Sequence, residues 1–265
     1  MTIYLASPWA PRGETARLLR YYEALMRIYD GLVVGVSSPE EREAAAALES
    51  LGVAFTYYER FSGRHAVLKL ALEAGADYIQ YIDMDRLVRW IELRPDELAA
   101  VARQVRTVDS LIIGRSEDAN NSHSRTLTET ERIPNLFFSH YFGRLMDFAA
   151  GSRGFSRRAA ELVLRYSTSD SALWMDAGWA VLVKRAGYSW DYTLVEGLDW
   201  ETADRYRDRA ATREEQQALA DEQDQDPHLW LMRARVAQEI TRYGLLAMDL
   251  PLDVTAGSTP QEEHA

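Results

Sequence analysis

The sequence predicts an α/β protein with a mainly parallel sheet that is covered by helices on both faces. Stretches with strand character alternate along the chain with stretches in which apolar residues recur at helical spacing. Several strand candidates, such as 32–36 and 111–113, are nearly continuous apolar runs. Such runs are typical of parallel strands that are buried on both faces.

The first half of the chain alternates strands and helices. Pro8 ends the first expected strand, Ser38 and Pro39 form a cap and first turn, and Pro95 begins a helix with Asp96 in its first turn. We expect strands at 2–7, 32–36, 54–58, 77–83 and 111–113, with helices at 14–29, 38–51, 63–75 and 95–106 between them.

The second half is less regular. Residues 115–134 lack a hydrophobic period and predict a polar loop of about 20 residues, a length usually found in functional or disordered loops. Such a loop could close over a bound ligand. After it we expect an aromatic helix at 137–145, a glycine turn at 151–154, helices at 156–166 and 173–186, a strand at 189–196, a solvated acidic segment at 201–226 and an amphipathic helix at 228–248.

Composition excludes several function classes. The 265 residues carry a net charge of −11, which argues against a general nucleic-acid binder. There are no cysteines, so disulfides, thiolate metal sites and cysteine nucleophiles are excluded. No signal peptide and no apolar run that could cross a bilayer are found. The expected location is the cytoplasm.

An acidic pair, Asp83 and Asp85, follows the apolar strand 77–83 directly. Ligands of parallel sheets collect beyond the carboxyl ends of the strands. Mg²⁺ and Mn²⁺ prefer oxygen ligands, and Mg²⁺ is often held by one or two carboxylates together with substrate phosphates. The pair therefore predicts a Mn²⁺ or Mg²⁺ site. In the structural alternative, Asp83 is a turn residue and Asp85 caps a helix.

Four segments around this pair resemble, in the same order, motifs of nucleotide-sugar glycosyltransferases of the GT-A type, in particular glycosyltransferase family 2. They are the glycine-initiated helix and strand at 63–79, the Pro-Asp-Glu helix start at 94–98, the Ile-Ile-Gly-Arg strand end at 112–115 and the glycine segment at 151–158. Met175-Asp176 and Val195-Glu196-Gly197 are also similar to mannosylglycerate and glucosyl-3-phosphoglycerate synthases.

The resemblance implies a GT-A (Rossmann-like) catalytic domain with a mixed sheet over 1–203, whose nucleotide-sugar half is about 1–115 and whose acceptor half is about 116–203. A helical extension at 204–250 and a flexible tail at 251–265 would follow. The implied activity is metal-dependent transfer of a hexosyl group from a nucleotide-diphosphate sugar to a hydroxyl or phosphate acceptor. A small soluble acceptor is favoured over a lipid phosphate because no membrane anchor is visible, and a homo-oligomer is left open.

The same resemblance distributes roles among the residues. Asp83 and Asp85 would hold the metal, where the cation stabilises the charge of the departing diphosphate. The donor would also contact the side chains of Pro8, Arg64 and Arg115, and the acceptor would contact Gly151, Ser152, Arg153 and Asp176.

Asp176 is also singular by its surroundings, because it is a lone carboxylate in an apolar segment. Burying it unpaired would be costly, so it should face a polar cavity, bind an arginine or have a raised pKa. A raised pKa suits a general base for the acceptor hydroxyl. The alternative is a structural ion pair with Arg153 or Arg185.

The chain departs from the family pattern at three places. The second strand ends in Gly35-Val36-Ser37-Ser38 without the acids that usually contact the base, and Arg64 and His65 replace the second and third residues of a Gly-Lys-Gly run. No histidine is present near 198–201, so Asp199, or else Glu201, would have to serve as a third metal ligand.

Two other functions stay open. A haloacid-dehalogenase-type phosphohydrolase also places Asp-x-Asp after an apolar strand, but normally after its first strand, and Leu87 is unusual at its position. A non-catalytic sugar-nucleotide-binding protein is the third hypothesis.

Overall fold

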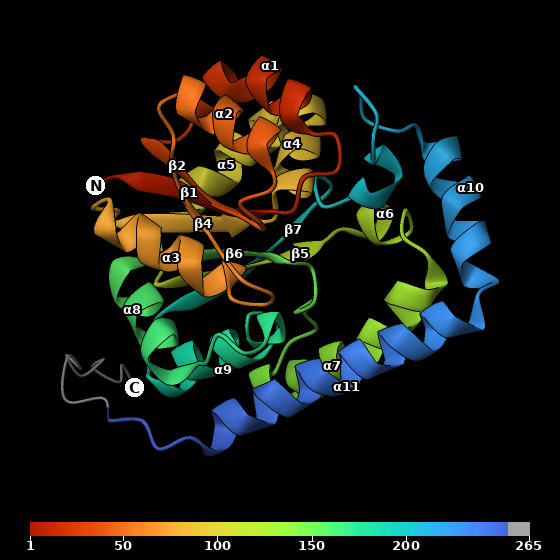
Figure 1. Cartoon of the computed structure of the whole chain (residues 1–265). Helices are drawn as coiled ribbons and strands as arrows, with labels where there is room; N and C mark the ends of the chain where they lie inside the picture. Colours follow the sequence, from red (N-terminus) through yellow and green to blue (C-terminus); the bar gives the residue numbers. More distant parts are fainter. Residues whose placement is uncertain (254–265) are drawn as a thin grey trace.

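The computed structural model describes residues 1–253, which form a seven-stranded sheet with helices on both faces (Figure 1). The strand order is β3-β2-β1-β4-β6-β5-β7, and only β6 runs antiparallel to its neighbours, β4 and β5. The expected mixed, mainly parallel sheet is therefore confirmed. The strands are β1 (Ile3–Trp9), β2 (Gly31–Val36), β3 (Ala54–Tyr57), β4 (Tyr78–Ile82), β5 (Ser110–Arg115), β6 (Ser152–Ser156) and β7 (Trp190–Val195).

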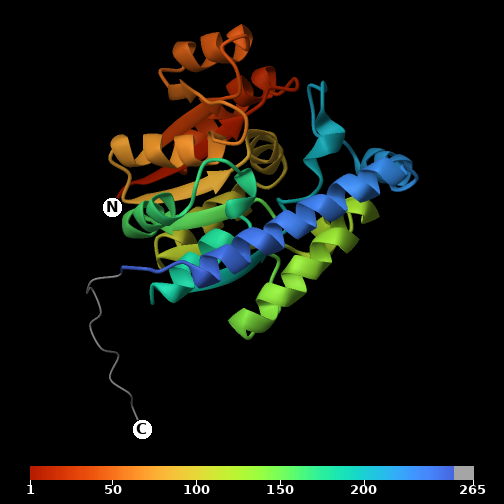
Figure 2. The same cartoon turned by 60° about the horizontal axis from the view of Figure 1, so that its bottom comes forward.

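The helices of the first half lie close to their expected positions, whereas those of the second half differ more. The α-helices are α1 (Thr15–Met26), α2 (Arg42–Ser50), α3 (Gly63–Glu73), α4 (Met84–Leu93), α5 (Pro95–Val105), α6 (Glu117–Asn120), α7 (Arg125–Phe142), α8 (Arg157–Tyr166), α9 (Gly178–Arg185), α10 (Arg213–Asp224) and α11 (Pro227–Asp249). Two short 3₁₀ helices are η1 (Ala172–Trp174) and η2 (Glu201–Asp204). In Figures 1 and 2 the long helix α11 lies alongside α7.

The sheet separates two hydrophobic cores, and the central strands contribute to both. In β5, Leu111 and Ile113 belong to the core under α1, α2, α4 and α5, whereas Ile112 belongs to the core under α3, α8, α9 and α11. Successive side chains of a strand point to opposite faces. The continuous apolar runs seen in the sequence are therefore explained by burial of both faces.

The expected loop at 115–134 is wrong, and with it the idea that this loop closes over a ligand. Residues 117–120 form α6, which Ser116 caps, and α7 begins at Arg125 and continues through Pro134. Three of the inward-facing residues of α7 are polar, namely Thr126, Thr130 and Glu131. This polar inner face removed the hydrophobic period from the sequence.

Three local predictions also need correction. Pro8 lies inside β1, paired with Gly35, and does not end the strand. Ser38 accepts a hydrogen bond from the amide of Glu40 at 3.1 Å in a turn, and α2 begins only at Arg42.

The glycine segment 151–154 is not a turn but leads into strand β6 (Ser152–Ser156). A Cβ atom at Gly154 would lie 2.5 Å from Cγ2 of Val105. The glycine therefore allows α5 to pack closely on this strand, a common reason for glycine within a strand.

The expected helix at 173–186 is interrupted. Residues 172–174 form η1, and α9 begins at Gly178, so Asp176 lies in the break between the two helices. A Cβ atom at Gly178 would lie 2.7 Å from the Trp174 ring and 3.3 Å from the carbonyl oxygen of Tyr243 in α11. Close packing against α11 thus occurs at this break.

The C-terminal part contains η2, α10 and α11, and α11 packs against α7, α9 and η1. The expected helix at 228–248 is confirmed, and most of the predicted tail, residues 254–265, lies outside the described residues. Within residues 1–253, no helix combines the length and the apolar character that crossing a bilayer requires.

Candidate active site at the end of strand β4

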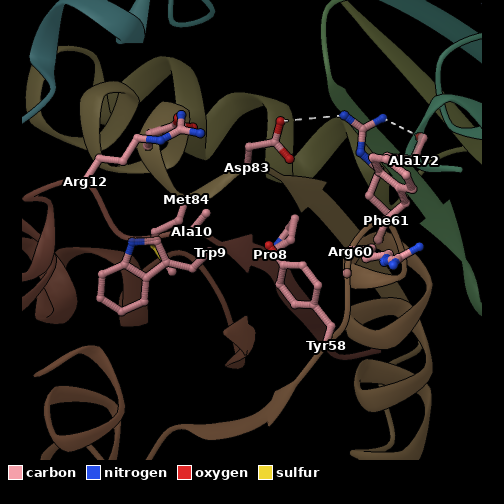
Figure 3. Close-up of a pocket in the computed structure, with 13 residues that line it drawn as sticks. Pro8, Trp9, Ala10, Arg12, Tyr58, Arg60, Phe61, Asp83, Met84 and Ala172 are labelled. Carbon is pink, nitrogen blue, oxygen red and sulfur yellow. Dashed lines mark hydrogen bonds and ion pairs between the residues drawn. The ribbon is translucent and has the colours of Figure 1, made fainter. Parts of the chain in front are cut away.

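The acidic pair lies where the sheet meets a cavity. Strand β4 ends at Ile82, Asp83 is the extended residue that precedes α4, and Asp85 lies in the first turn of that helix. Both acids line a cavity of about 630 Å³ (Figure 3). The other lining residues come from the ends of β1 and β3 and from the start of α3: they include Pro8, Trp9, Ala10, Arg12, Tyr58, Arg60, Phe61, Gly63 and Arg64.

Tyr58 accounts for the missing acid at the end of β2. A Cβ atom at Gly35 would lie 3.1 Å from the Tyr58 ring, and one at Gly63 would lie 2.8 Å from it. The two glycines therefore leave room for this ring at the cavity wall. Burial and the nearby Asp83 carboxylate raise the pKa of Tyr58 to about 12. Tyr58 is thus neutral at physiological pH.

Asp83 is held by two partners. The Tyr81 hydroxyl donates a hydrogen bond to Oδ1, and Nη2 of Arg64 lies 3.9 Å from Oδ2. Arg64 also donates from Nη1 to the carbonyl oxygen of Ala172 at 2.7 Å, and the same nitrogen lies 3.7 Å from Oδ1 of Asp176. Dashed lines at Asp83 and Ala172 mark the first and second of these Arg64 contacts in Figure 3. Arg64 therefore bridges two carboxylates.

Asp85 lies in a more negative environment. Its Oδ1 accepts a hydrogen bond from the amide of Arg86 at 2.9 Å, and Nη1 of Arg12 is 3.8 Å from Oδ2. Burial first, and then the charges of Glu201 and Asp83, raise the pKa of Asp85 to about 7. Glu201 itself lies 3.4 Å from Nε of Arg86. The negative charges outweigh the positive ones at this end of the cavity.

This arrangement fits a divalent cation that is held partly by a ligand. No group of three or more His, Cys, Asp and Glu residues that could hold a metal is found within residues 1–253. Mg²⁺, however, is commonly bound through one or two carboxylates together with substrate phosphates. The two cavity-lining acids, Asp83 and Asp85, match that pattern, and a cation would relieve the repulsion that raises the pKa of Asp85.

Not all of the expected site residues meet here. Pro8 and Arg64 line the cavity with the acidic pair, but Arg115 does not. Arg115 is buried, with Nη2 at 2.7 Å from Glu131 and Nε at 2.7 Å from Asp147. It borders a different cavity beneath α7, so a direct contact with the donor in the acidic cavity is wrong.

The residues expected at the acceptor lie beneath the cavity and do not line it. Ser152 is buried and donates to the carbonyl oxygen of Tyr81 at 3.0 Å. Arg153 is also fully buried and donates from Nη2 to the carbonyl oxygen of Asp176 at 2.7 Å. Gly151, with φ +77°, approaches Arg86 closely. These residues support the site from below.

Asp176 is 4% exposed and does not line the cavity. Burial raises the pKa of its carboxyl group, and the charges of Arg64 and Arg153 oppose that increase. Arg185 is not its partner, because it donates to the carbonyl oxygens of Ala247 and Leu250. Of the possibilities drawn from the sequence, the structure shows both an arginine partner and a raised pKa.

The third-ligand role expected for Asp199 is wrong. Both of its oxygens accept hydrogen bonds from Arg89 at 2.7 Å, and it borders a different cavity. Glu201, the alternative, is the acid whose charge acts most strongly on Asp85.

Arg12, Tyr58 and Arg60 were missed, because they lie on loops that follow other strands and no local motif marks them. The order of the strands carried a signal for Arg12, since β1 and β4 are parallel neighbours whose ends face the same cavity.

The fold is of the GT-A type, in which a mixed sheet carries a ligand cavity at the ends of its parallel strands. No family model and no curated protein matches the sequence. Among solved structures, the chain is similar to glucosyl-3-phosphoglycerate synthase from Mycobacterium tuberculosis in complex with Mn²⁺, UDP and phosphoglyceric acid, with 12% identity, coverage of 95% of this chain and 80% of that chain, and a TM-score of 0.53.

A further mycobacterial protein has 12% identity, coverage of 95% and 76% and a TM-score of 0.56. A cytidylyltransferase from Leptospira borgpetersenii has 10% identity, coverage of 95% and 98% and a TM-score of 0.46. The first two likenesses confirm, at the level of the fold, the suspected resemblance to GT-A transferases and glucosyl-3-phosphoglycerate synthases.

Proposed function

We propose that the protein is a metal-dependent glycosyltransferase that moves a sugar from a nucleotide-diphosphate sugar to a hydroxyl of a small soluble acceptor, with a phosphate acceptor as the variant of this reaction. The observation that carries the proposal is the joint presence of two acids and three arginines in one cavity at the ends of the parallel strands. Carboxylates suit a divalent cation, and arginines suit phosphate oxygens.

The fold supports the same interpretation. The similar synthase from Mycobacterium tuberculosis was solved with Mn²⁺, UDP and phosphoglyceric acid. A donor of the nucleotide-sugar class and a small phosphate-bearing acceptor are consistent with the cavity of this chain, whose arginines are Arg12, Arg60 and Arg64. The sugar and the base are left open by the residues that line it.

Asp83 and Asp85 would hold Mn²⁺ or Mg²⁺, and the bound cation would stabilise the negative charge of the departing diphosphate. The Tyr81 hydroxyl orients Asp83 by its hydrogen bond. Arg64 places a permanent positive charge beside Asp83, anchored by the carbonyl oxygen of Ala172. Such a charge is suited to phosphate oxygens.

For Asp176 we propose the role of the general base that accepts the proton of the acceptor hydroxyl. Its support is a buried carboxyl group with a raised pKa that lies 3.7 Å from a cavity-lining arginine, Arg64. For this role the Arg64 side chain must shift enough to admit the acceptor. Ser152 and Arg153 would hold the backbone beneath this position.

The test is incubation of the protein with Mn²⁺ and a panel of UDP-, GDP- and ADP-sugars, followed by measurement of the released nucleoside diphosphate. Slow metal-dependent hydrolysis of one donor is expected, with loss of donor binding in Asp85→Ala. Asp96→Ala, at an exposed acid of α5, is the control and should behave as the wild type. Release of phosphate from simple esters would favour a phosphohydrolase, and binding without turnover would favour a non-catalytic binding protein.

The cytoplasmic location and a homo-oligomeric state stay predictions beside this proposal. A lipid-phosphate acceptor is the alternative to the small soluble one, and a competition assay with both acceptor types would separate them.

A further inference from the structure

The three arginines that line the acidic cavity are held in different ways. Arg64 contacts Asp83, Asp176 and the carbonyl oxygen of Ala172, and its side chain is 16% exposed. The side chain of Arg12 has a single ion-pair partner within residues 1–253, Asp85 at 3.8 Å, and is 38% exposed. Arg64 is thus anchored, whereas Arg12 is free to change partners.

The backbone of Arg12, by contrast, is fixed. Its amide donates to Oε2 of Glu14 at 2.7 Å, and its carbonyl oxygen accepts a hydrogen bond from the amide of Tyr206 at 2.6 Å. The next residue, Gly13, has φ +101°, and a Cβ atom there would lie 2.7 Å from Cα of Tyr206. The loop therefore presents the Arg12 side chain from a rigid base, and only that side chain has room to move.

Arg12 and a divalent cation compete for the same group. A cation bound to Asp85 needs an ionised carboxylate with free oxygens, and Arg12 offers that carboxylate its positive charge from 3.8 Å. Once the cation neutralises Asp85, the arginine loses its partner. A diphosphate that shares the cation would then bring phosphate oxygens to the same end of the cavity, and a guanidinium group binds such oxygens through two parallel hydrogen bonds.

We propose that Arg12 is a diphosphate-binding residue that exchanges partners: it pairs with Asp85 in the free protein, and it leaves Asp85 to the divalent cation and binds the diphosphate when both ligands are present. This inference rests on the proposed function, because it assigns a residue to the same metal and nucleotide site. It assigns the strength of cation binding without nucleotide to the competition with Arg12. It also makes the two ligands bind cooperatively, and the coupling must be equal in both directions.

The exchange predicts opposite effects of one substitution on the two ligands. Arg12→Gln removes the competing charge, so Mn²⁺ should bind roughly two- to fivefold more tightly without nucleotide, the range expected for loss of a partly exposed ion pair. The same variant should bind the diphosphate at least about tenfold more weakly at saturating Mn²⁺, because it loses a charge-assisted hydrogen bond. A merely structural role would weaken both.

Mn²⁺ binding is measured by electron paramagnetic resonance of the free ion, and nucleotide binding by calorimetry with UDP and GDP at saturating Mn²⁺. Arg60→Gln is the matched control, because Arg60 lines the same cavity but lies on the side away from Arg12 in Figure 3, with no ion pair to any of residues 1–253. Its Mn²⁺ affinity without nucleotide should stay within about 1.5-fold of the wild type, since it does not compete at Asp85. Arg12→Lys, which keeps the charge but not the planar fork, should retain wild-type Mn²⁺ affinity and lose diphosphate affinity.

Unchanged or weaker Mn²⁺ binding in Arg12→Gln overturns the exchange, as does unchanged diphosphate binding. If the glutamine variant does not fold, unchanged diphosphate binding in Arg12→Lys overturns the exchange instead. The two proposals fail in distinguishable ways. If the wild type binds Mn²⁺ and a nucleoside diphosphate but Arg12→Gln shows no opposite effects, the exchange alone fails. If the wild type binds neither ligand, the proposed function fails and the exchange fails with it.

Discussion

Gly151 tests whether the backbone beneath the acidic cavity fixes the position of Arg86. The glycine has φ +77°, and a Cβ atom there would collide with Nη1 of Arg86 and lie 3.1 Å from its Cζ. The same guanidinium donates a hydrogen bond to the carbonyl oxygen of Ala150 and lies 3.4 Å from Glu201. In Gly151→Ala, the arginine must therefore leave its place.

Two costs add in this variant. The left-handed backbone costs an alanine about 1 kcal/mol, and displacement of a buried charged hydrogen bond costs about 2 kcal/mol. The free energy of unfolding should therefore fall by roughly 3 kcal/mol, which lowers the Tm by about 6–12 °C in a chain of this size. Calorimetry or urea unfolding of the two proteins measures the difference.

Gly143 is the matched control. It also has φ +77°, but a Cβ atom there would meet nothing within 4 Å. Gly143→Ala should therefore cost only the backbone term, about 1 kcal/mol. In an Arg86→Ala background, Gly151→Ala should fall to the same value, because nothing is left to displace. If Gly151→Ala and Gly143→Ala are equally stable in the wild-type background, the contact with Arg86 is not a constraint and this reasoning is wrong.

Three further predictions concern acids. Because the pKa of Asp85 is about 7, Mn²⁺ affinity should fall by up to about tenfold per pH unit below 7, and Glu201→Gln should move that fall to lower pH; a flat affinity profile between pH 8 and 5.5 would contradict this. That raised pKa also means that ionisation of Asp85 costs stability as pH rises from about 4 to 7, so Asp85→Asn should flatten the stability profile in that window. Asp199→Asn should lower the free energy of unfolding by about 3 kcal/mol in urea and leave Mn²⁺ affinity unchanged, since its partner is a buried arginine; weaker Mn²⁺ binding would restore it as a ligand. Asp176→Asn should reduce sugar transfer by about a hundredfold or more and spare donor binding, and unchanged turnover would remove Asp176 from the mechanism.

The strands and helices of the nucleotide-sugar half were predictable because each carries its own signal. In β5, three consecutive apolar residues face alternate cores, which gives the continuous run of a buried parallel strand. In α5, Pro95 and the acids of the first turn mark the start of the helix. These signals are local, so they survive without knowledge of the tertiary structure.

The second half was less predictable because polar residues are buried there. The inner face of α7 contains Thr130 and Glu131, and the latter pairs with Arg115 beneath the helix. Strand β6 carries the fully buried Arg153 at its centre, whose charge is met by carbonyl oxygens. Polar side chains satisfied by distant partners erase hydrophobic periodicity, and no sequence pattern could replace it.

At the site, sequence motifs identified the acids but could not separate ligand-binding acids from structural ones. Asp85 and Asp199 were both expected at the metal, yet the structure shows how they differ. Both oxygens of Asp199 are occupied by Arg89 at 2.7 Å, so no lone pair is directed at a cavity. Asp85 has its arginine at 3.8 Å and borders open space, which leaves its carboxylate available to a cation. The tightness of the arginine pair, which depends on folding of η2 against α4, therefore decides which acid can serve a ligand.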